Sequence, residues 1–338
     1  DSGTNTSEYY NAGTDGVLTI LGEKLEVEKD NQEYRAENTL TKLRGLFTAA
    51  NYAGGEWPDY CITTDPRKTE MELNEICNQR FIKLFHSYQT RDGVYDGSSS
   101  GAVGMLSPMK WKGRPIVSNV FVGYSNQKGD FDNGEYLGGD NYVLGVKNTY
   151  EKKGFRASIT PMIGLNDLGV IDFDTDKVET KAANFLSEFG AINGKIDKKI
   201  GVEDRYLNIS IEGTYGLQRF PEYLSKFTDG DLSVDESIEQ LLSGGFEVSY
   251  SETLPGNFVI KPYIGASLNR NLNDTINITA RSKNADVTND KRETWSGYHA
   301  GVSLVKKTKD LNFDLDLMYG NEDGLINQIA AISLTKSF

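Results

Sequence analysis

Residues 311–320 alternate strictly between apolar and polar or small side chains, and this pattern most constrains what the chain can form. Leu311, Phe313 and Leu315 would share one face of a strand with Leu317 and Tyr319, because successive strand side chains point to opposite sides of the sheet. The same alternation returns at 155–165, 207–217, 258–268 and 298–304. Such strands exceed the ~5–6 residues common in soluble sheets and approach the ~10 residues of a tilted strand that crosses a bilayer.

The composition excludes several classes of protein. Hydrophobic residues make up 38% of the chain, below the ~45–50% of an average globular protein, and no run approaches the ~20 apolar residues of a membrane-spanning helix. A barrel strand needs an apolar side chain only at every second position, so this low content remains compatible with a membrane β-barrel. The net charge of −13 argues against nucleic acid as a partner, and two His and two Cys are too few for a His/Cys metal centre. We expect no metal and no cofactor.

The connections between the alternating segments are of two kinds. Short ones are expected at 112–114, 152–154, 254–256 and 307–310, and long polar ones at 128–139, 168–180, 219–240 and 272–293. Short turns at one end and long loops at the other are typical of outer-membrane barrels, whereas a β-sandwich has no reason to sort its loops. The sequence therefore predicts an all-β fold, a barrel of twelve antiparallel strands at about 79–91, 100–111, 115–126, 140–152, 155–167, 182–197, 204–218, 242–254, 257–271, 295–307, 310–320 and 325–338.

Two prolines inside the predicted strands require local interruptions of the ladder, and aromatic residues near the strand ends are expected to form girdles. Pro161 and Pro262 lie inside predicted strands, where each lacks an N–H for the ladder and requires a bulge or an unpaired position. Aromatic rings sit well between acyl chains and water, so an outer-membrane barrel carries them in girdles near its strand ends. The residues expected in these girdles are Tyr88, Trp111, Tyr124, Tyr142, Tyr150, Phe155, Tyr215, Tyr250, Phe258, Trp295 and Tyr319.

Several charged residues fall on the polar parity of their strands and are expected to face the barrel lumen. They are Arg156, Glu212, Glu247, Lys261, His299, Asp314 and Asp316. A hydrated barrel interior tolerates such charges without any special role. Contact with a segment threaded through the lumen, or a bias on ion passage, is the functional alternative.

The segment from Arg80 to Ser125 carries a likeness to a known family. It contains the apolar strand 81–85, the loop start Asp92-Gly93, the run 101–105, Trp111 and the run 120–125. Together with the strand count, the spacing and the C-terminal Phe338, these features make residues 79–338 resemble the translocator barrel of autotransporters from Gram-negative bacteria. The resemblance implies that the barrel-assembly machinery reads Phe338, although Lys336 replaces the apolar residue that the family usually has there.

The resemblance also implies a helix that precedes the first strand and threads the barrel. We expect this helix at about 33–50, with Leu40, Leu43, Leu46 and Phe47 on one face, and keep 66–78 as an alternative; either could instead pack outside the pore. Residues 1–78 would then form an N-terminal extension, with Asp1 the start of a mature or truncated product. In an oxidising periplasm Cys61 and Cys77 are expected to form a disulfide, which would contribute about 3 kcal/mol; two free thiols are the alternative.

The function implied is that of an outer-membrane translocator that anchors and helps to export a passenger linked to its N-terminal side, with no enzyme activity. The partners expected are outer-membrane lipids and lipopolysaccharide, the barrel-assembly machinery and the linked passenger, with the chain a monomer. A porin-like channel with an N-terminal plug or cap is the main alternative. A barrel hydrolase that uses His86 or His299 is a further one, but no motif surrounds either residue.

Overall fold

The structure is a computed structural model, and it describes residues 79–92, 95–105, 109–110, 116–131, 136–152, 155–173, 179–202, 205–227, 230–234, 236–272, 275–280, 285–290, 294–308, 311–322 and 324–337. Among these residues no helix is long and apolar enough to cross a membrane. The described part of the chain is built from β-strands: β1 (Gln79–Arg91), β2 (Tyr95–Met105), β3 (Met109–Lys110), β4 (Ile116–Phe131), β5 (Tyr136–Lys152), β6 (Phe155–Phe173), β7 (Glu179–Val202), β8 (Arg205–Phe220), β9 (Tyr223–Phe227), β10 (Gly230–Val234), β11 (Ser237–Leu254), β12 (Phe258–Asn271), β13 (Thr275–Ala280), β14 (Ala285–Asp290), β15 (Thr294–Lys307), β16 (Leu311–Glu322) and β17 (Leu325–Ser337).

Twelve of these strands close into an antiparallel barrel, which confirms the predicted fold class. Each strand pairs with the next long strand along the chain, and β1 completes the ring by pairing with both β17 and β2. The two-residue strand β3 pairs with the N-terminal end of β4. Closure leaves no unpaired edge in the wall, which satisfies the backbone groups that a bilayer cannot.

Several predicted strand limits are wrong, mostly because strands continue past the membrane. The second strand is Tyr95–Met105 rather than 100–111, so it begins earlier and ends before Trp111. The expected loops 128–139 and 168–180 are largely strand, since β4 pairs with β5 up to Asp130 and Tyr136, and β6 with β7 up to Phe173 and Glu179. Beyond the bilayer both faces of a strand are wet, so alternation disappears from the sequence while the backbone ladder continues.

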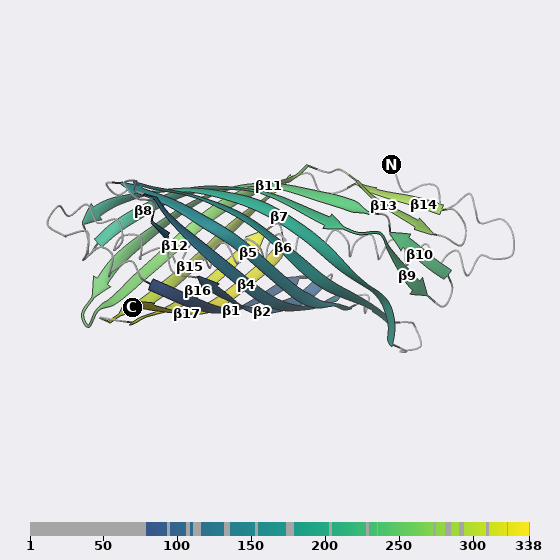
Figure 1. Cartoon of the computed structure of the whole chain (residues 1–338), viewed down its shortest axis with the longest axis horizontal. Helices are drawn as coiled ribbons and strands as arrows, with labels where there is room; N and C mark the ends of the chain where they lie inside the picture. Colours follow the sequence, from purple (N-terminus) through teal and green to yellow (C-terminus); the bar gives the residue numbers. More distant parts are fainter. Residues whose placement is uncertain are drawn as a thin grey trace.

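The two longest expected loops, 219–240 and 272–293, contain a second sheet. Its four strands lie in the order β14-β13-β10-β9 and come from two hairpins joined through β10 and β13. Figure 1 shows this sheet beyond one end of the barrel, while the C-terminus lies at the other end. The long connections therefore lie at the end of the barrel that carries the second sheet. The short turns lie at the other end, where β1 begins and β17 ends.

The prolines interrupt the ladder as their missing N–H requires. Pro161 is paired with Ile192 of β7, but the register between β5 and β6 skips from Gly145 to Asn148 beside it. Pro262 is paired with Val302 of β15, and the register between β11 and β12 has a similar gap. Each proline thus breaks the pairing on one side of its strand and leaves the barrel closed.

Candidate functional site

The inward face of the barrel carries a ring of ionisable side chains, here called the charged belt. It contains five cations, five carboxylates and one histidine: Lys83, Lys147, Arg156, Lys195, Lys261, Asp197, Glu212, Glu247, Asp314, Asp316 and His299. Along the wall, the cations Lys147, Arg156 and Lys195 occupy the neighbouring strands β5, β6 and β7. Most of the carboxylates occupy the arc from β8 to β16, so the belt has a basic sector and a largely acidic one.

On β1 and β16 the belt is held together by an ion pair and a tyrosine. Nζ of Lys83 lies 3.8 Å from Oδ2 of Asp316, and these side chains are 1% and 6% exposed. The hydroxyl of Tyr263 donates to the other oxygen of Asp316 at 3.1 Å. On the same strand as Asp316, Asp314 accepts a hydrogen bond of 2.8 Å from Ser303. Because each carboxylate accepts a hydrogen bond, the cost of burying its charge is reduced.

Further contacts within the charged belt involve residues of β15, β11 and β7. Nε2 of His299 lies 3.3 Å from Oε2 of Glu247, and Glu247 also interacts electrostatically with Lys195 of the basic sector. Nζ of Lys195 lies 3.9 Å from Oδ1 of Asp197, which accepts a hydrogen bond of 2.5 Å from Ser210. Electrostatic contacts therefore connect the basic sector on β7 with the acidic sector on β11 along the wall.

Aromatic rings lie on inward-facing glycines of the adjacent strand. A ring is directly opposite the glycine in five cross-strand pairs: Phe85–Gly101, Phe121–Gly145, Phe189–Gly164, Tyr263–Gly301 and His299–Gly265. A methyl group added at Gly145 would lie 2.3 Å from Cζ of Phe121. The rings therefore replace the missing side chains and fix the shape of the inner wall.

An apolar cluster also faces inward, which the alternation pattern did not predict. Its members are Val103, Met105, Val117, Phe121, Val143, Met162, Phe189, Ala191, Leu241 and Trp295, with Phe85 packed against them. The expected girdle position of Trp295 is therefore wrong, because its side chain is only 9% exposed and lies in this cluster. The parity of Trp295 matches that of His299 on the same strand, and this signal could have placed it inside.

The seven charged residues expected to face the lumen share the parity of the buried side chains on their strands. Glu247 and Asp316 are 9% and 5% exposed, and the other five are half-buried. Sequence reasoning missed Lys83, Lys147 and Lys195, together with Asp197. The parity of Lys83 agrees with that of Ser87 and Gln89 on the same strand, which are also buried.

The outward face carries the apolar residues and most of the expected girdle. Tyr88, Tyr124, Tyr142, Phe155, Tyr215, Tyr250, Phe258 and Tyr319 are exposed there, Tyr150 is half-buried, and Trp111 lies outside the described residues. Near the long-strand end, Tyr88 and Tyr124 donate to Asp96 and Asp140 at 3.1 and 2.8 Å. Each tyrosine thus keeps its ring in the apolar band and its hydroxyl in a polar layer.

Above this layer a charged cluster joins β7, β8 and Glu236, the residue directly before β11. Arg219 of β8 donates two hydrogen bonds to Glu236, of 2.9 and 3.0 Å, and lies 3.6 Å from Glu188 of β7. Hydrogen bonding from Arg219 lowers the pKa of Glu236. Glu188 therefore has a charged partner beyond the apolar band.

The two histidines lie on opposite faces of the wall. His299 contacts Glu247 on the inward face, whereas His86 is exposed on the outward face and bonds Ser100 at 2.8 Å. The remaining candidate residues lie outside the described part of the chain. These are the helix residues Leu40, Leu43, Leu46 and Phe47, the cysteines Cys61 and Cys77, and the terminal Phe338.

A closed barrel with an apolar outward band, an aromatic girdle and a charged lumen is an outer-membrane type of barrel. A family model described as the autotransporter beta-domain matches residues 85–318, well over half of the chain. The chain therefore belongs to the autotransporter beta-domain family. It is a translocator domain that exports a linked passenger across the outer membrane, and a transport barrel rather than an enzyme.

Solved structures with the same fold include three autotransporter barrels. The beta domain of BrkA from Bordetella has 14% sequence identity and a TM-score of 0.56, and the match covers 77% of this chain and 99% of that one. The translocator domain of NalP from Neisseria meningitidis has 12% identity and a TM-score of 0.52, covering 87% and 98%. The transport unit of AIDA-I from Escherichia coli has 14% identity and a TM-score of 0.52, covering 84% and 98%. No curated protein matches the sequence at a significant level.

Proposed function

We propose that the segment before β1 passes through the lumen after export and closes the barrel as a helix, at about residues 33–50. The observation that carries this proposal is the burial of the lumen wall. The inward-facing Lys83, Ser187 and Gln218 are at most 1% exposed, as expected of a wall that contacts another segment rather than an open channel. The extension would then be residues 1–78 and the barrel residues 79–338.

The charges of segment 33–50 are also compatible with those of the charged belt. Segment 33–50 contains Glu33, Arg35, Glu37, Lys42 and Arg44, and the charged belt contains equal numbers of cations and carboxylates. A helix that carries both signs can pair with both sectors of the belt, which avoids leaving either sector desolvated without a partner. The alternative segment 66–78 carries both signs as well, so the experiment has to separate the two.

Single-channel conductance in planar bilayers tests the proposal. The full chain should show near-closed behaviour, and deletion of residues 1–78 should give a stable open pore. Deletion of residues 1–32 alone is the matched control, because it removes chain but leaves the proposed helix, and should remain closed. Deletion of 1–65 should open the pore if 33–50 is the plug and leave it closed if 66–78 is. A large stable pore in the full chain would instead identify a porin-like channel.

The remaining partners follow from the closed wall and its outward face. A closed barrel offers no edge strand to a second copy, which supports a monomer in the outer membrane. The outward-facing Ala330, Ile332 and Leu334 of β17 precede Phe338 in the sequence, consistent with an apolar signal there for the barrel-assembly machinery. Replacing Phe338 with Ala should reduce the amount of folded barrel in outer membranes, measured by heat-modifiable electrophoretic mobility.

A further inference from the structure

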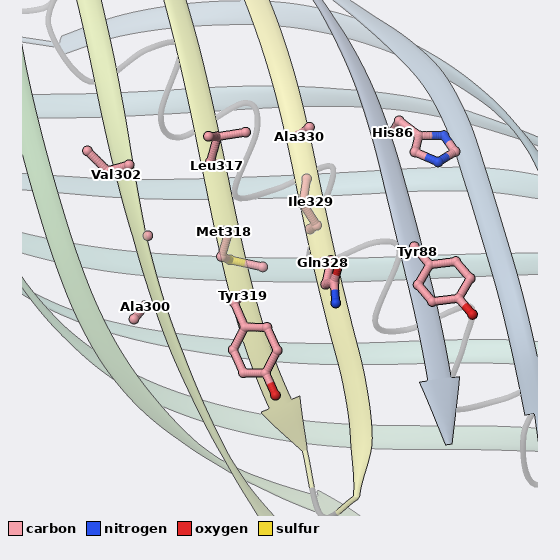
Figure 2. Close-up of a pocket in the computed structure, with 11 residues that line it drawn as sticks. His86, Tyr88, Ala300, Val302, Leu317, Met318, Tyr319, Gln328, Ile329 and Ala330 are labelled. Atoms are coloured by element: carbon pink, nitrogen blue, oxygen red, sulfur yellow. The ribbon is translucent and has the colours of Figure 1, made fainter. Parts of the chain in front are cut away.

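The outward face of the wall is hollowed by a groove of about 710 Å³ over β15, β16, β17 and β1, here called the β17 groove. Figure 2 shows His86 and Tyr88 on one side of β17 and Leu317 and Tyr319 on the other. Its volume falls within the ~300–1,000 Å³ range of ligand pockets.

The register explains why the wall is hollow at this place. Ala330 of β17 is paired with His86 on β1 and with Leu317 on β16, so a small side chain lies between two larger ones. One step toward the long-strand end, Gln328 lies between Tyr88 and Tyr319. The groove therefore follows β17, with Ala330 as its floor and Gln328 near its mouth.

The mouth of the groove, its end at Gln328, is the end nearer the outer limit of the apolar band. Tyr88 beside its mouth donates to Asp96 in the polar layer at the long-strand end. In the other direction along β17, the outward-facing Ile332 and Leu334 continue the apolar band. The groove thus lies in the half of the membrane that forms the outer leaflet, and any occupant comes from the lipids there.

Polar side chains in this lipid-facing position need hydrogen-bond partners. Nδ1 of His86 bonds the hydroxyl of Ser100 at 2.8 Å, and within the described residues neither Nε2 of His86 nor the amide of Gln328 has a hydrogen bond. Polar groups without partners are costly in hydrocarbon, which offers none. An acyl chain alone would leave both groups unpaired, so the occupant needs oxygen atoms close to the polar end of its chain.

We propose that the β17 groove binds an acyl chain of the outer-leaflet glycolipid, lipopolysaccharide. Its ester, amide or hydroxyl oxygens accept hydrogen bonds from His86 and Gln328. The proposal rests on the outer-membrane location and not on the plugging of the lumen, so conductance measurements do not decide it.

Native mass spectrometry of the full chain, extracted from outer membranes in mild detergent and delipidated, tests the proposal with purified rough lipopolysaccharide as the probe. The wild type should bind one molecule per chain. Ala330→Leu fills the floor and should weaken binding at least about tenfold, equivalent to about 1.4 kcal/mol. Gln328→Leu with His86→Phe removes the polar groups while keeping the groove, and should weaken binding as well.

Ala266→Leu is the matched control. Ala266 is also an outward-facing alanine between larger residues, since it is paired with Phe246 and Tyr298 on its neighbouring strands. This variant should bind like the wild type, and heat-modifiable mobility should show that every variant is folded. Equal binding by Ala330→Leu and wild type would overturn the proposal. Equal competition by phosphatidylethanolamine would overturn the choice of glycolipid, and a wild-type dimer lost in Ala330→Leu would identify the groove as an interface between copies.

Discussion

The inward and outward faces of the barrel wall are formed by the same strands, but their side chains are stabilised in different ways. On β16, Leu317 and Tyr319 face outward and are 46% and 43% exposed, whereas Asp316, directly before Leu317, faces inward and is 5% exposed. Lipid solvates an outward apolar side chain without any particular partner. An inward carboxylate instead depends on individual groups, here Lys83 and Tyr263.

This difference shows at which positions of the wall the identity of the side chain matters. Outward positions require a class of side chain, and many apolar residues meet that requirement. Inward positions require particular neighbours, because a buried charge or ring is placed by the strand beside it. Matched substitutions on the two faces should therefore have unequal effects.

The largest effect is expected from breaking the buried pair between β1 and β16. Asp316→Leu leaves the ammonium of Lys83 without its nearest carboxylate, and should lower the free energy of unfolding by about 3 kcal/mol. The double variant with Lys83→Met should recover most of this loss, because no uncompensated charge remains. Urea unfolding in detergent micelles measures both.

A solvent-exposed pair provides the control for that measurement. Arg205 and Glu252 lie 2.9 Å apart with side chains 67% and 29% exposed, so Arg205→Gln should cost less than about 1 kcal/mol. Equal losses in Asp316→Leu and Arg205→Gln would show that the inward face is no more specific than the surface.

A smaller difference is expected between an inward and an outward glycine. A methyl group at Gly164 would lie 2.1 Å from Cζ of Phe189 and 2.3 Å from the carbonyl oxygen of Tyr142. Gly164→Ala should therefore cost about 1–3 kcal/mol in urea unfolding. Gly244 faces outward with nothing within 4 Å, so Gly244→Ala should be neutral or stabilising by up to about 1 kcal/mol. The prediction fails if the two variants unfold alike.

The sequence was sufficient to predict which residues form the outward face and how many strands form the barrel. Leu311, Phe313 and Leu315 repeat at every second position because lipid rewards apolar side chains on one side only, and this signal is local. Where the membrane ends the signal ends too, so the outer parts of β6 and β7 and the second sheet could not be predicted. Their pairing depends on backbone hydrogen bonds, which leave no mark on side-chain type.

For the inward face, the sequence predicted which residues point into the lumen but not which residues contact one another. The polar parity gave residues such as Glu247 and Asp316, yet the partner of Asp316 is Lys83, near the other end of the barrel sequence. The lumen also accepts apolar residues such as Phe121, whose ring needs Gly145 on the next strand. Neither fact can be read from one segment, because closure of the barrel brings the segments together.

The smallest effect is expected beyond the membrane, where an outward charge is exposed on all sides. Hydrogen bonds from Arg219 lower the pKa of Glu236 below its ordinary value of 4.5, so its charged form is favoured in the folded protein. Such a group adds stability above the pKa of the unfolded chain and loses it as pH falls through the folded value. The melting temperature of Glu236→Gln should therefore lie below that of the wild type by no more than about 2 °C at pH 7, and the gap should close toward pH 3. Arg219→Gln should lower the melting temperature similarly, and the double variant should add nothing further if the pair acts as one unit. A gap that persists unchanged at pH 3 would mean that Glu236 contributes through packing and not through its charge.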